Sequence, residues 1–188
     1  MKLVGGIDIE TTGLEQSEGH RIVEVAVCLY DFDTREPKGS FVQRINPQRS
    51  ISTAAQAVHG ISFEELVSEP VWEDVAPKLV KILKALYLGV AHNGLRFDMP
   101  FIRGELMRVG LAMPDVPIVD TMVDARWATP MGKFPNLGEL CYSLDIPYDP
   151  AKAHGAEYDV SVMMAAFFKG YDAGFFQLPE TLRLASAA

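Results

Sequence analysis

Hydrophobic and polar positions alternate clearly near the start of the chain, in the run LVGGIDIE over residues 3–10. Ile7 and Ile9 flank Asp8, and β-branched residues of this kind are typical of strands. Because side chains alternate between the two faces of a strand, Asp8 and Glu10 would lie side by side on one face, opposite the isoleucines. Two like charges this close repel each other unless a cation lies between them. The pattern fits either an edge strand with one wetted face or a strand that presents two metal-binding carboxylates.

The rest of the pattern predicts one mixed α/β domain. Residues 21–32 and 39–47 predict two strands that join the first in an antiparallel meander, and residues 88–92 form a short buried strand. Residues 118–128 read as a strand leading into a helix. Two short helices over 52–67 each open at a serine that could cap them. Longer helices are expected over 71–87 (with Pro77 in its first turns or at a kink), 99–111, 136–146 and 158–174.

Length and composition bound the class of protein. A chain of 188 residues is long enough for one domain and short for two, so we expect a single domain over 1–176 and a partly disordered tail over 177–188. Neither a membrane-length apolar run nor a secretory leader is present in the sequence, which predicts a cytoplasmic protein. Cys28 and Cys141 are widely separated and read as reduced core residues.

The formal net charge of −8 argues against a protein that coats nucleic acid by charge alone. It leaves room for an enzyme that grips a few nucleotides through bound metal ions, and part of the acidic excess would then belong to the metal site. The lysines of the helix over 71–87 fit a solvated face better than a nucleic-acid stripe.

Three further stretches carry candidate chemistry: AHNGLRFD around Asp98, VDTMVDARW around Asp120, and HGAEYD, which places His154 five residues before Asp159. Five residues of ideal helix would point the last two side chains about 140° apart. They converge only if His154 lies in a loop and Asp159 in the first turn of a helix, where a carboxylate is also favoured by the helix dipole.

Each of these residues has a structural alternative. Asp98 could cap a helix, Asp159 could serve only the helix dipole, and His154 could be a surface-loop histidine. For Asp120 we prefer a structural role, capping the next helix through Thr121. Taken together, however, four acidic residues at strand ends or helix starts, with one histidine, fit a hard divalent metal site of magnesium or manganese.

The order of the motifs DIETTGL, HNGLRFD and HGAEYD resembles the DEDD superfamily of 3′→5′ exonucleases, in the subtype with a histidine base (DEDDh) and the DnaQ-like branch of the DNA polymerase III epsilon subunit. The first motif, D-x-E-x-T-G, is matched by Asp8, Glu10, Thr12 and Gly13. The second, H-N-x-x-F-D, is matched with one extra spacer residue, and the third is H-x-A-x-x-D. AVHGIS and VDTMVDAR also resemble the family, so the likeness spans residues 3–172.

The resemblance implies a ribonuclease H-like α/β fold, a mixed five-stranded sheet with helices on both faces. It also implies a metal-dependent 3′→5′ exonuclease that releases nucleoside monophosphates from single-stranded DNA. Two Mg²⁺ or Mn²⁺ ions would be held by Asp8, Glu10, Asp98 and Asp159, with His154 as the general base. The terminal nucleotide would be received by Thr11, Thr12, Gly13 and Leu14, with His59 and Asn93 as further candidates.

Two other functions stay open: a 3′→5′ exoribonuclease acting on RNA ends or short oligoribonucleotides, and a non-catalytic binding module on an exonuclease fold. The sequence departs from the family at Ile9, where threonine is often found, and at Glu157, where leucine is often found. The chain ends soon after the third motif, without the extra tail that tethers the epsilon subunit to its polymerase. We therefore expect single-stranded nucleic acid ends as the partner, DNA rather than RNA, without polymerase association; a homodimer stays open.

Overall fold

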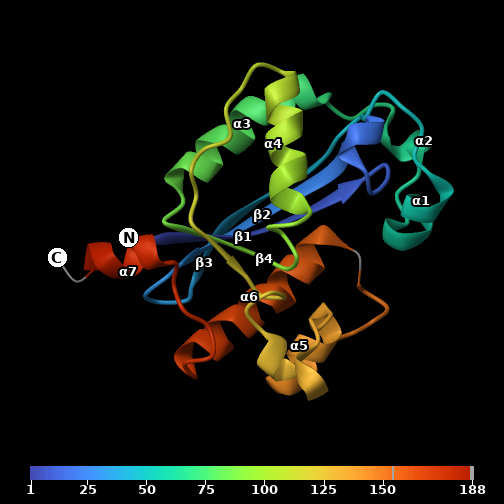
Figure 1. Cartoon of the computed structure of the whole chain (residues 1–188). Helices are drawn as coiled ribbons and strands as arrows, with labels where there is room; N and C mark the ends of the chain where they lie inside the picture. Colours follow the sequence, from blue (N-terminus) through green and yellow to red (C-terminus); the bar gives the residue numbers. More distant parts are fainter. Residues whose placement is uncertain (154, 187–188) are drawn as a thin grey trace.

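A mixed five-stranded sheet forms the centre of the molecule, in the strand order β3-β2-β1-β4-β5 (Figure 1). The computed structural model describes residues 1–153 and 155–186. The strands are β1 (Leu3–Thr11), β2 (Ile22–Asp31), β3 (Pro37–Arg44), β4 (Leu88–Ala91) and β5 (Ile118–Asp120). The first three pair antiparallel, whereas β4 runs parallel to both β1 and β5. The predicted mixed sheet is confirmed.

Helices cover both faces of this sheet (Figure 1). On one face lie α3 (Trp72–Ala85) and α4 (Asp98–Arg108), and on the other lie α5 (Leu137–Ser143) and α6 (Ala156–Asp172). The short helices α1 (Thr53–His59) and α2 (Phe63–Leu66) lie beside the end of β1. Three 3₁₀ turns complete the connections: η1 (Gln16–Glu18), η2 (Arg126–Ala128) and η3 (Pro130–Gly132).

The alternation in β1 separates its two faces as predicted. Ile7 and Ile9 are buried in the core that β1 shares with α3 and α4, so Asp8 and Glu10 face the layer of α6. Gly6 lies on this second face, and a Cβ there would come within 2.6 Å of a Val160 methyl carbon of α6. The glycine therefore lets α6 approach the sheet closely, and this approach brings the first turn of α6 towards the acidic face of β1.

Local signals explain the helix starts. The Ser52 hydroxyl accepts the N–H of Ala55, and Ser62 forms a reciprocal capping box with Glu65, which confirms both predicted serine caps. Pro77 lies inside α3 without ending it.

The segment after β5 differs from its prediction. The expected helix to Ala128 is wrong, because only the short 3₁₀ turn η2 forms there. The Asp120 carboxylate accepts hydrogen bonds from the N–H groups of Met122 and Val123, and the backbone carbonyl of Asp120 accepts one from the N–H of Asp124. These bonds wind the chain into a tight turn and compete with a regular helix.

The C-terminal segment 177–188 includes a helix, α7 (Glu180–Ser186). Leu178 and Leu182 pack against the buried cluster that contains Phe176. In the part of the chain that the structure describes, every helix is too short or too polar to cross a lipid bilayer.

Candidate active site

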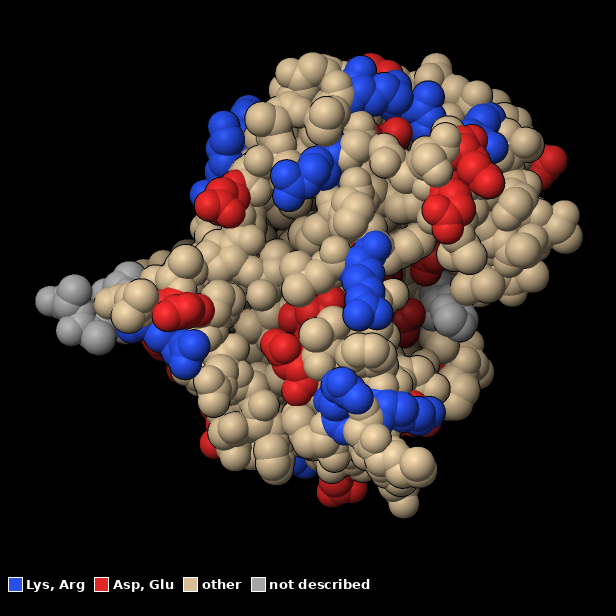
Figure 2. All heavy atoms as spheres, viewed as in Figure 1, with Lys and Arg blue, Asp and Glu red and all other residues tan. Residues whose placement is uncertain are grey.

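Four carboxylates from three elements meet beside the end of β1. Asp8 and Glu10 come from β1, Asp98 is the first residue of α4, and Asp159 lies in the first turn of α6. Asp8 experiences repulsion from Asp98, Glu10 and Asp159, so the fold brings together the four acidic residues singled out in the sequence. Figure 2 shows acidic side chains gathered in a hollow of the molecule, with Lys and Arg side chains beside them.

Asp98 is fixed by the turn that precedes it. The chain leaves β4 through Asn93, whose φ of 64° is unusual for a residue with a side chain. The buried Asp120 carboxylate accepts the N–H groups of Asn93 and Leu95, each at 3.0 Å. Asp98 itself accepts the N–H of Ile9 at 3.0 Å. The structural role that we preferred for Asp120 is therefore to hold the turn that presents Asp98, rather than to cap a helix.

The carboxylates favour their protonated forms when no cation is near. Burial, followed by repulsion from Asp98, Glu10 and Asp159, raises the pKa of Asp8 well above its ordinary value. Burial and the neighbouring Glu24 raise the pKa of Glu10 to about 8. Burial also raises the pKa of Asp98 to about 7, although the Ile9 N–H opposes this change. Placing negative charge here is costly unless a cation compensates it.

The donor set fits a hard divalent cation. Asp8, Glu10 and Asp98 make no ion pair with a lysine or arginine among the described residues, and carboxylate oxygens are the ligands that Mg²⁺ and Mn²⁺ prefer. Within residues 1–153 and 155–186, no group of three or more His, Cys, Asp or Glu side chains forms a preformed metal-binding site. Asp8, Glu10, Asp98 and Asp159 are nevertheless the residues that would hold an ion, because a cation would compensate the repulsion among them.

Glu24 is a further acidic residue beside the site, and our sequence reasoning missed it. It lies directly opposite Glu10 in the pairing of β1 with β2 and is only 9% exposed. Its carboxylate binds the Arg44 Nε at 3.2 Å, and Arg44 also pairs with Glu65. A single charged residue inside the apolar run IVEVAVC is the signal that could have found it. Arg44 compensates Glu24 and leaves Glu10 without a counterion.

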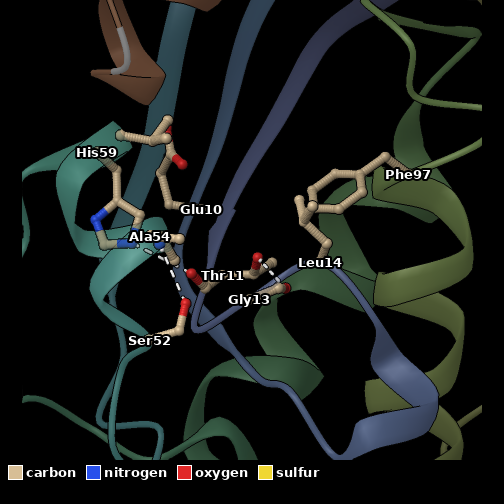
Figure 3. Close-up of a pocket in the computed structure, with 10 residues that line it drawn as sticks. Glu10, Thr11, Gly13, Leu14, Ser52, Ala54, His59 and Phe97 are labelled. Carbon is tan, nitrogen blue, oxygen red and sulfur yellow. Dashed lines mark hydrogen bonds between the residues drawn. The ribbon is translucent and has the colours of Figure 1, made fainter.

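A first hollow opens beside Glu10. Figure 3 shows His59 on one wall and the side chains of Leu14 and Phe97 together on the opposite wall. Leu14 is 77% exposed. The Ile61 N–H donates to the His59 Nδ1 at 3.0 Å, so Nε2 carries the hydrogen and faces the Thr11 carbonyl at 3.2 Å. The hollow is lined by Glu10, Thr11, Gly13, Leu14, Ser52, Ala54, Ala55, Val58, His59 and Phe97.

Thr12 shapes the turn below this hollow and does not line it. Its side chain is buried, its N–H donates to the Arg21 carbonyl, and its hydroxyl lies 2.9 Å from the His20 Nδ1. The His20 ring packs under Gly13, where a Cβ would meet the ring at 2.3 Å. The structure thus places the His20 ring beneath the Thr12–Gly13 turn.

A second hollow contains Asp8 and Asp159 together with His92, Asn93 and Tyr148. Asn93 thus lies beside Asp8 and Asp159 and does not line the hollow of Leu14. The His92 Nδ1 lies 3.0 Å from the Thr121 hydroxyl, which donates to the Ala91 carbonyl. Burial lowers the pKa of His92, which favours its neutral form.

His154, the predicted general base, lies outside the described residues. Gly155 is the N-cap of α6, and the residues that follow it form the first turn that carries Asp159. The requirement that Asp159 lie in a first turn is met, and the role of His154 stays a prediction.

The chain belongs to the exonuclease family RNase_T, whose model matches residues 6–167. The 3′-5′ exonuclease DinG of Bacillus subtilis is 31% identical over 163 residues, which are 87% of this chain and 17% of DinG. The DNA polymerase III subunit epsilon of Rickettsia conorii is 31% identical over 168 residues, which are 86% of this chain and 70% of that protein. The chain thus spans a small part of DinG and about two thirds of the epsilon subunit.

Solved structures share the fold. Exonuclease I of E. coli, in complex with a dT13 oligonucleotide, superposes with a TM-score of 0.79 at 18% identity, covering 98% of this chain and 46% of that one. The nuclease domain of 3′hExo, a DEDDh family member bound to rAMP, superposes with a TM-score of 0.78 at 17% identity, covering 95% and 96%. The sheet and its two helical layers are those of the ribonuclease H-like exonucleases, as the resemblance predicted.

Proposed function

We propose that the protein hydrolyses the terminal phosphodiester bond at the 3′ end of single-stranded DNA and releases one nucleoside 5′-monophosphate at a time. One observation carries this proposal: Asp8, Glu10 and Asp98 lie together beside an apolar-walled hollow, with raised pKa values and no basic partner among the described residues. The names of the relatives support it, because DinG is a 3′-5′ exonuclease and exonuclease I is solved with a single-stranded oligonucleotide.

Separate residues bind the metal ions and the terminal nucleotide. Asp8, Glu10, Asp98 and Asp159 would hold two Mg²⁺ or Mn²⁺ ions, which would stabilise the negative charge that develops as the phosphodiester bond is cut. The exposed Leu14 and the backbone around Gly13 receive the terminal nucleotide in the first hollow. His59 holds α1 against the end of β1 through the Thr11 carbonyl, and thereby fixes the opposite wall.

Proton transfer completes the reaction. His154 takes a proton from the attacking water, because an imidazole changes charge near neutral pH. The water oxygen forms the new bond to phosphorus, and the bond from phosphorus to the 3′ oxygen of the preceding nucleotide breaks. Neutral, half-buried His92 is a positioning residue beside Asp8 and Asn93.

End-labelled substrates test this function. Single-stranded DNA, duplex DNA and RNA, each labelled at the 5′ end, are incubated with Mg²⁺, Mn²⁺ or EDTA. We expect a descending ladder from single-stranded DNA with either metal and none in EDTA. Nicking of a closed circle, or immediate release of the 5′ label as a mononucleotide, would contradict a 3′ exonuclease.

A second function, 3′→5′ exoribonuclease, is favoured by one observation: the 3′hExo nuclease domain is bound to rAMP. Faster degradation of RNA than of DNA in the same experiment would establish it. Binding of all substrates without cleavage in Mn²⁺ would instead establish a binding module. A cytoplasmic location stays a prediction from the sequence, and a homodimer stays open.

A further inference from the structure

We propose that Arg96, Phe134 and Arg126 form a phosphate clamp for the substrate strand on the 5′ side of the bond that is cut. This proposal rests on the proposed function, because the clamp extends the same site. It narrows the preferred substrates to oligonucleotides longer than a dinucleotide.

The three side chains form one cluster at the surface. The guanidinium carbons of Arg96 and Arg126 lie 5.0 and 5.2 Å from the centroid of the Phe134 ring. All three residues are exposed, and the ring itself is 37% exposed. A guanidinium that contacts an aromatic ring keeps N–H groups free at its edge, and those groups match the oxygens of a phosphate.

The two arginines lack anionic partners. Across residues 1–153 and 155–186, neither Arg96 nor Arg126 forms an ion pair, whereas Arg21, Arg44 and Arg108 each bind a glutamate. Arg103 of α4 likewise forms no ion pair among these residues, so Arg96 and Arg126 are distinguished by their shared contact with the Phe134 ring. Their charge is available to an anion that comes from outside.

The loop that carries two of the three residues is closed on itself. The Arg126 Nε donates to the Gly132 carbonyl, and the Thr129 hydroxyl donates to the Lys133 carbonyl. These bonds fix the segment 126–134, which then presents Arg126 and Phe134 together. Such preorganisation lowers the entropy cost of binding.

The cluster lies beside the path of the substrate. Arg96 lines a small surface hollow together with Leu14 and Phe97, and these two residues also form one wall of the hollow beside Glu10 (Figure 3). A terminal nucleotide in the hollow beside Glu10 therefore directs the preceding nucleotide across the wall of Leu14 and Phe97, towards Arg96. Arg96 is also two residues before Asp98, in the turn that Asp120 holds.

The clamp would offset electrostatic repulsion between the site and the substrate strand. The acidic floor of the site repels the phosphates of an incoming strand, and metal ions compensate this repulsion only close to the bond that is cut. The guanidiniums of Arg96 and Arg126 attract the rest of the strand.

The test measures binding and cleavage separately. Binding of a fluorescent single-stranded oligonucleotide of about eight nucleotides is followed by anisotropy in Ca²⁺, whose larger and looser shell serves catalysis poorly. Compared with wild type, Arg96→Gln/Arg126→Gln should bind roughly tenfold or more weakly. The slope of log K against log salt should become shallower by about 1.4, at about 0.7 for each phosphate that the protein no longer neutralises.

Matched controls separate the clamp from general charge and from folding. Arg103→Gln removes one exposed arginine of α4 that forms no ion pair with any described residue, and should leave both affinity and slope at wild-type values. Phe134→Leu keeps both charges, so the salt slope should persist while the affinity falls a few-fold. Thermal melts of all variants check that they fold.

Cleavage in Mn²⁺ gives the second measurement. The ratio of kcat/KM for the oligonucleotide to that for a dinucleotide should fall roughly tenfold in Arg96→Gln/Arg126→Gln, and Arg103→Gln should keep the wild-type ratio. A double variant with wild-type affinity, salt slope and length dependence overturns the clamp while the exonuclease stands, and a wild type that does not bind the oligonucleotide also overturns it. A wild type that binds through the two arginines but cleaves nothing refutes the proposed function and supports the clamp.

Discussion

The backbone N–H of Ile9 donates a hydrogen bond of 3.0 Å to the carboxylate of Asp98, 89 positions further along the chain. Strand β4 pairs with β1 only over Val4–Gly6, so the backbone of β1 beyond Gly6 has no strand on that side. Asp98 supplies the acceptor that a neighbouring strand would otherwise provide. The first and second sequence motifs are therefore joined directly, through a side chain that is also a predicted metal ligand.

This bond predicts different outcomes for two substitutions of Asp98. Asp98→Asn and Asp98→Ala should both abolish cleavage, because each removes a carboxylate that we propose as a metal ligand. Only Asp98→Ala leaves the buried Ile9 N–H without an acceptor, so it should lower the free energy of unfolding by about 1–3 kcal/mol relative to Asp98→Asn. Urea unfolding in EDTA measures the difference. Equal stability of the two variants would show that the bond contributes nothing.

The raised pKa of Glu10 makes the metal-free protein sensitive to pH. The group titrates near 4.5 when unfolded and at about 8 when folded, so the folded state binds the extra proton between these values. The stability that the raised pKa of Glu10 gives to the folded state is fully present below about pH 4.5 and is lost as the pH rises towards about 8. In EDTA, wild type should therefore lose stability relative to Glu10→Gln as the pH rises through this window.

Thermal melts of the two proteins across the window measure that loss. Glu64→Gln, at an exposed position of α2, is the matched control and should follow wild type. The stabilisation that Mn²⁺ gives wild type should grow with pH, because metal ions compete with protons for the carboxylates. A wild type that gains stability relative to Glu10→Gln as the pH rises would contradict the assigned direction.

Neutralising Asp8 should separate function from stability. Asp8→Asn should abolish cleavage, yet the metal-free variant should be at least as stable as wild type near neutral pH, because burial and repulsion from Asp98, Glu10 and Asp159 force wild-type Asp8 to take up a proton on folding and Asn does not need one. Added Mn²⁺ should stabilise the variant less than wild type. A markedly lower melting temperature in EDTA would mean that Asp8 serves the fold rather than a metal.

Local patterns in the sequence predicted much of the fold and the acidic part of the site. The alternation of hydrophobic and polar residues placed Asp8 and Glu10 on one face of the strand. Ser52 and Ser62 predicted the starts of their helices, because capping depends on neighbouring residues only. Glu24 and His20 were missed for a different reason. The position of Glu24 beside Glu10 depends on the pairing register of two strands, and that of His20 depends on the path of the loop between them. Neither is a local property of the chain.

Two histidines should respond differently to substitution. A general base contributes about 10² to 10⁴ in rate, so His154→Ala should lower single-turnover cleavage by that order while the Mn²⁺ affinity, measured by calorimetry, stays nearly unchanged. His92→Ala should instead lower stability by about 0.5–1.5 kcal/mol, because it removes the hydrogen bond between Nδ1 and the Thr121 hydroxyl. Wild-type cleavage rates for His154→Ala would show that the base is assigned wrongly.

The packing of His20 under Gly13 predicts a coupled pair of substitutions. Gly13→Ala would place a Cβ 2.3 Å from the His20 ring, which the Thr12 hydroxyl holds at 2.9 Å. The turn must then shift, so we expect KM for a short oligonucleotide to rise by about tenfold or more, with a smaller effect on kcat, because in the proposed function the turn binds the terminal nucleotide and holds no metal. His20→Ala removes the obstructing ring.

The double variant Gly13→Ala/His20→Ala should therefore recover part of the affinity, with a coupling energy of about 1 kcal/mol or more in the double-mutant cycle. His20→Ala alone is the control, because it reports what the ring contributes when Gly13 is intact. Circular dichroism melts of all three variants separate a shifted turn from a loss of folding. If the effects on KM simply add, the His20 ring does not hold the turn, and the geometry of the Thr12–Gly13 segment is set by its backbone bonds alone.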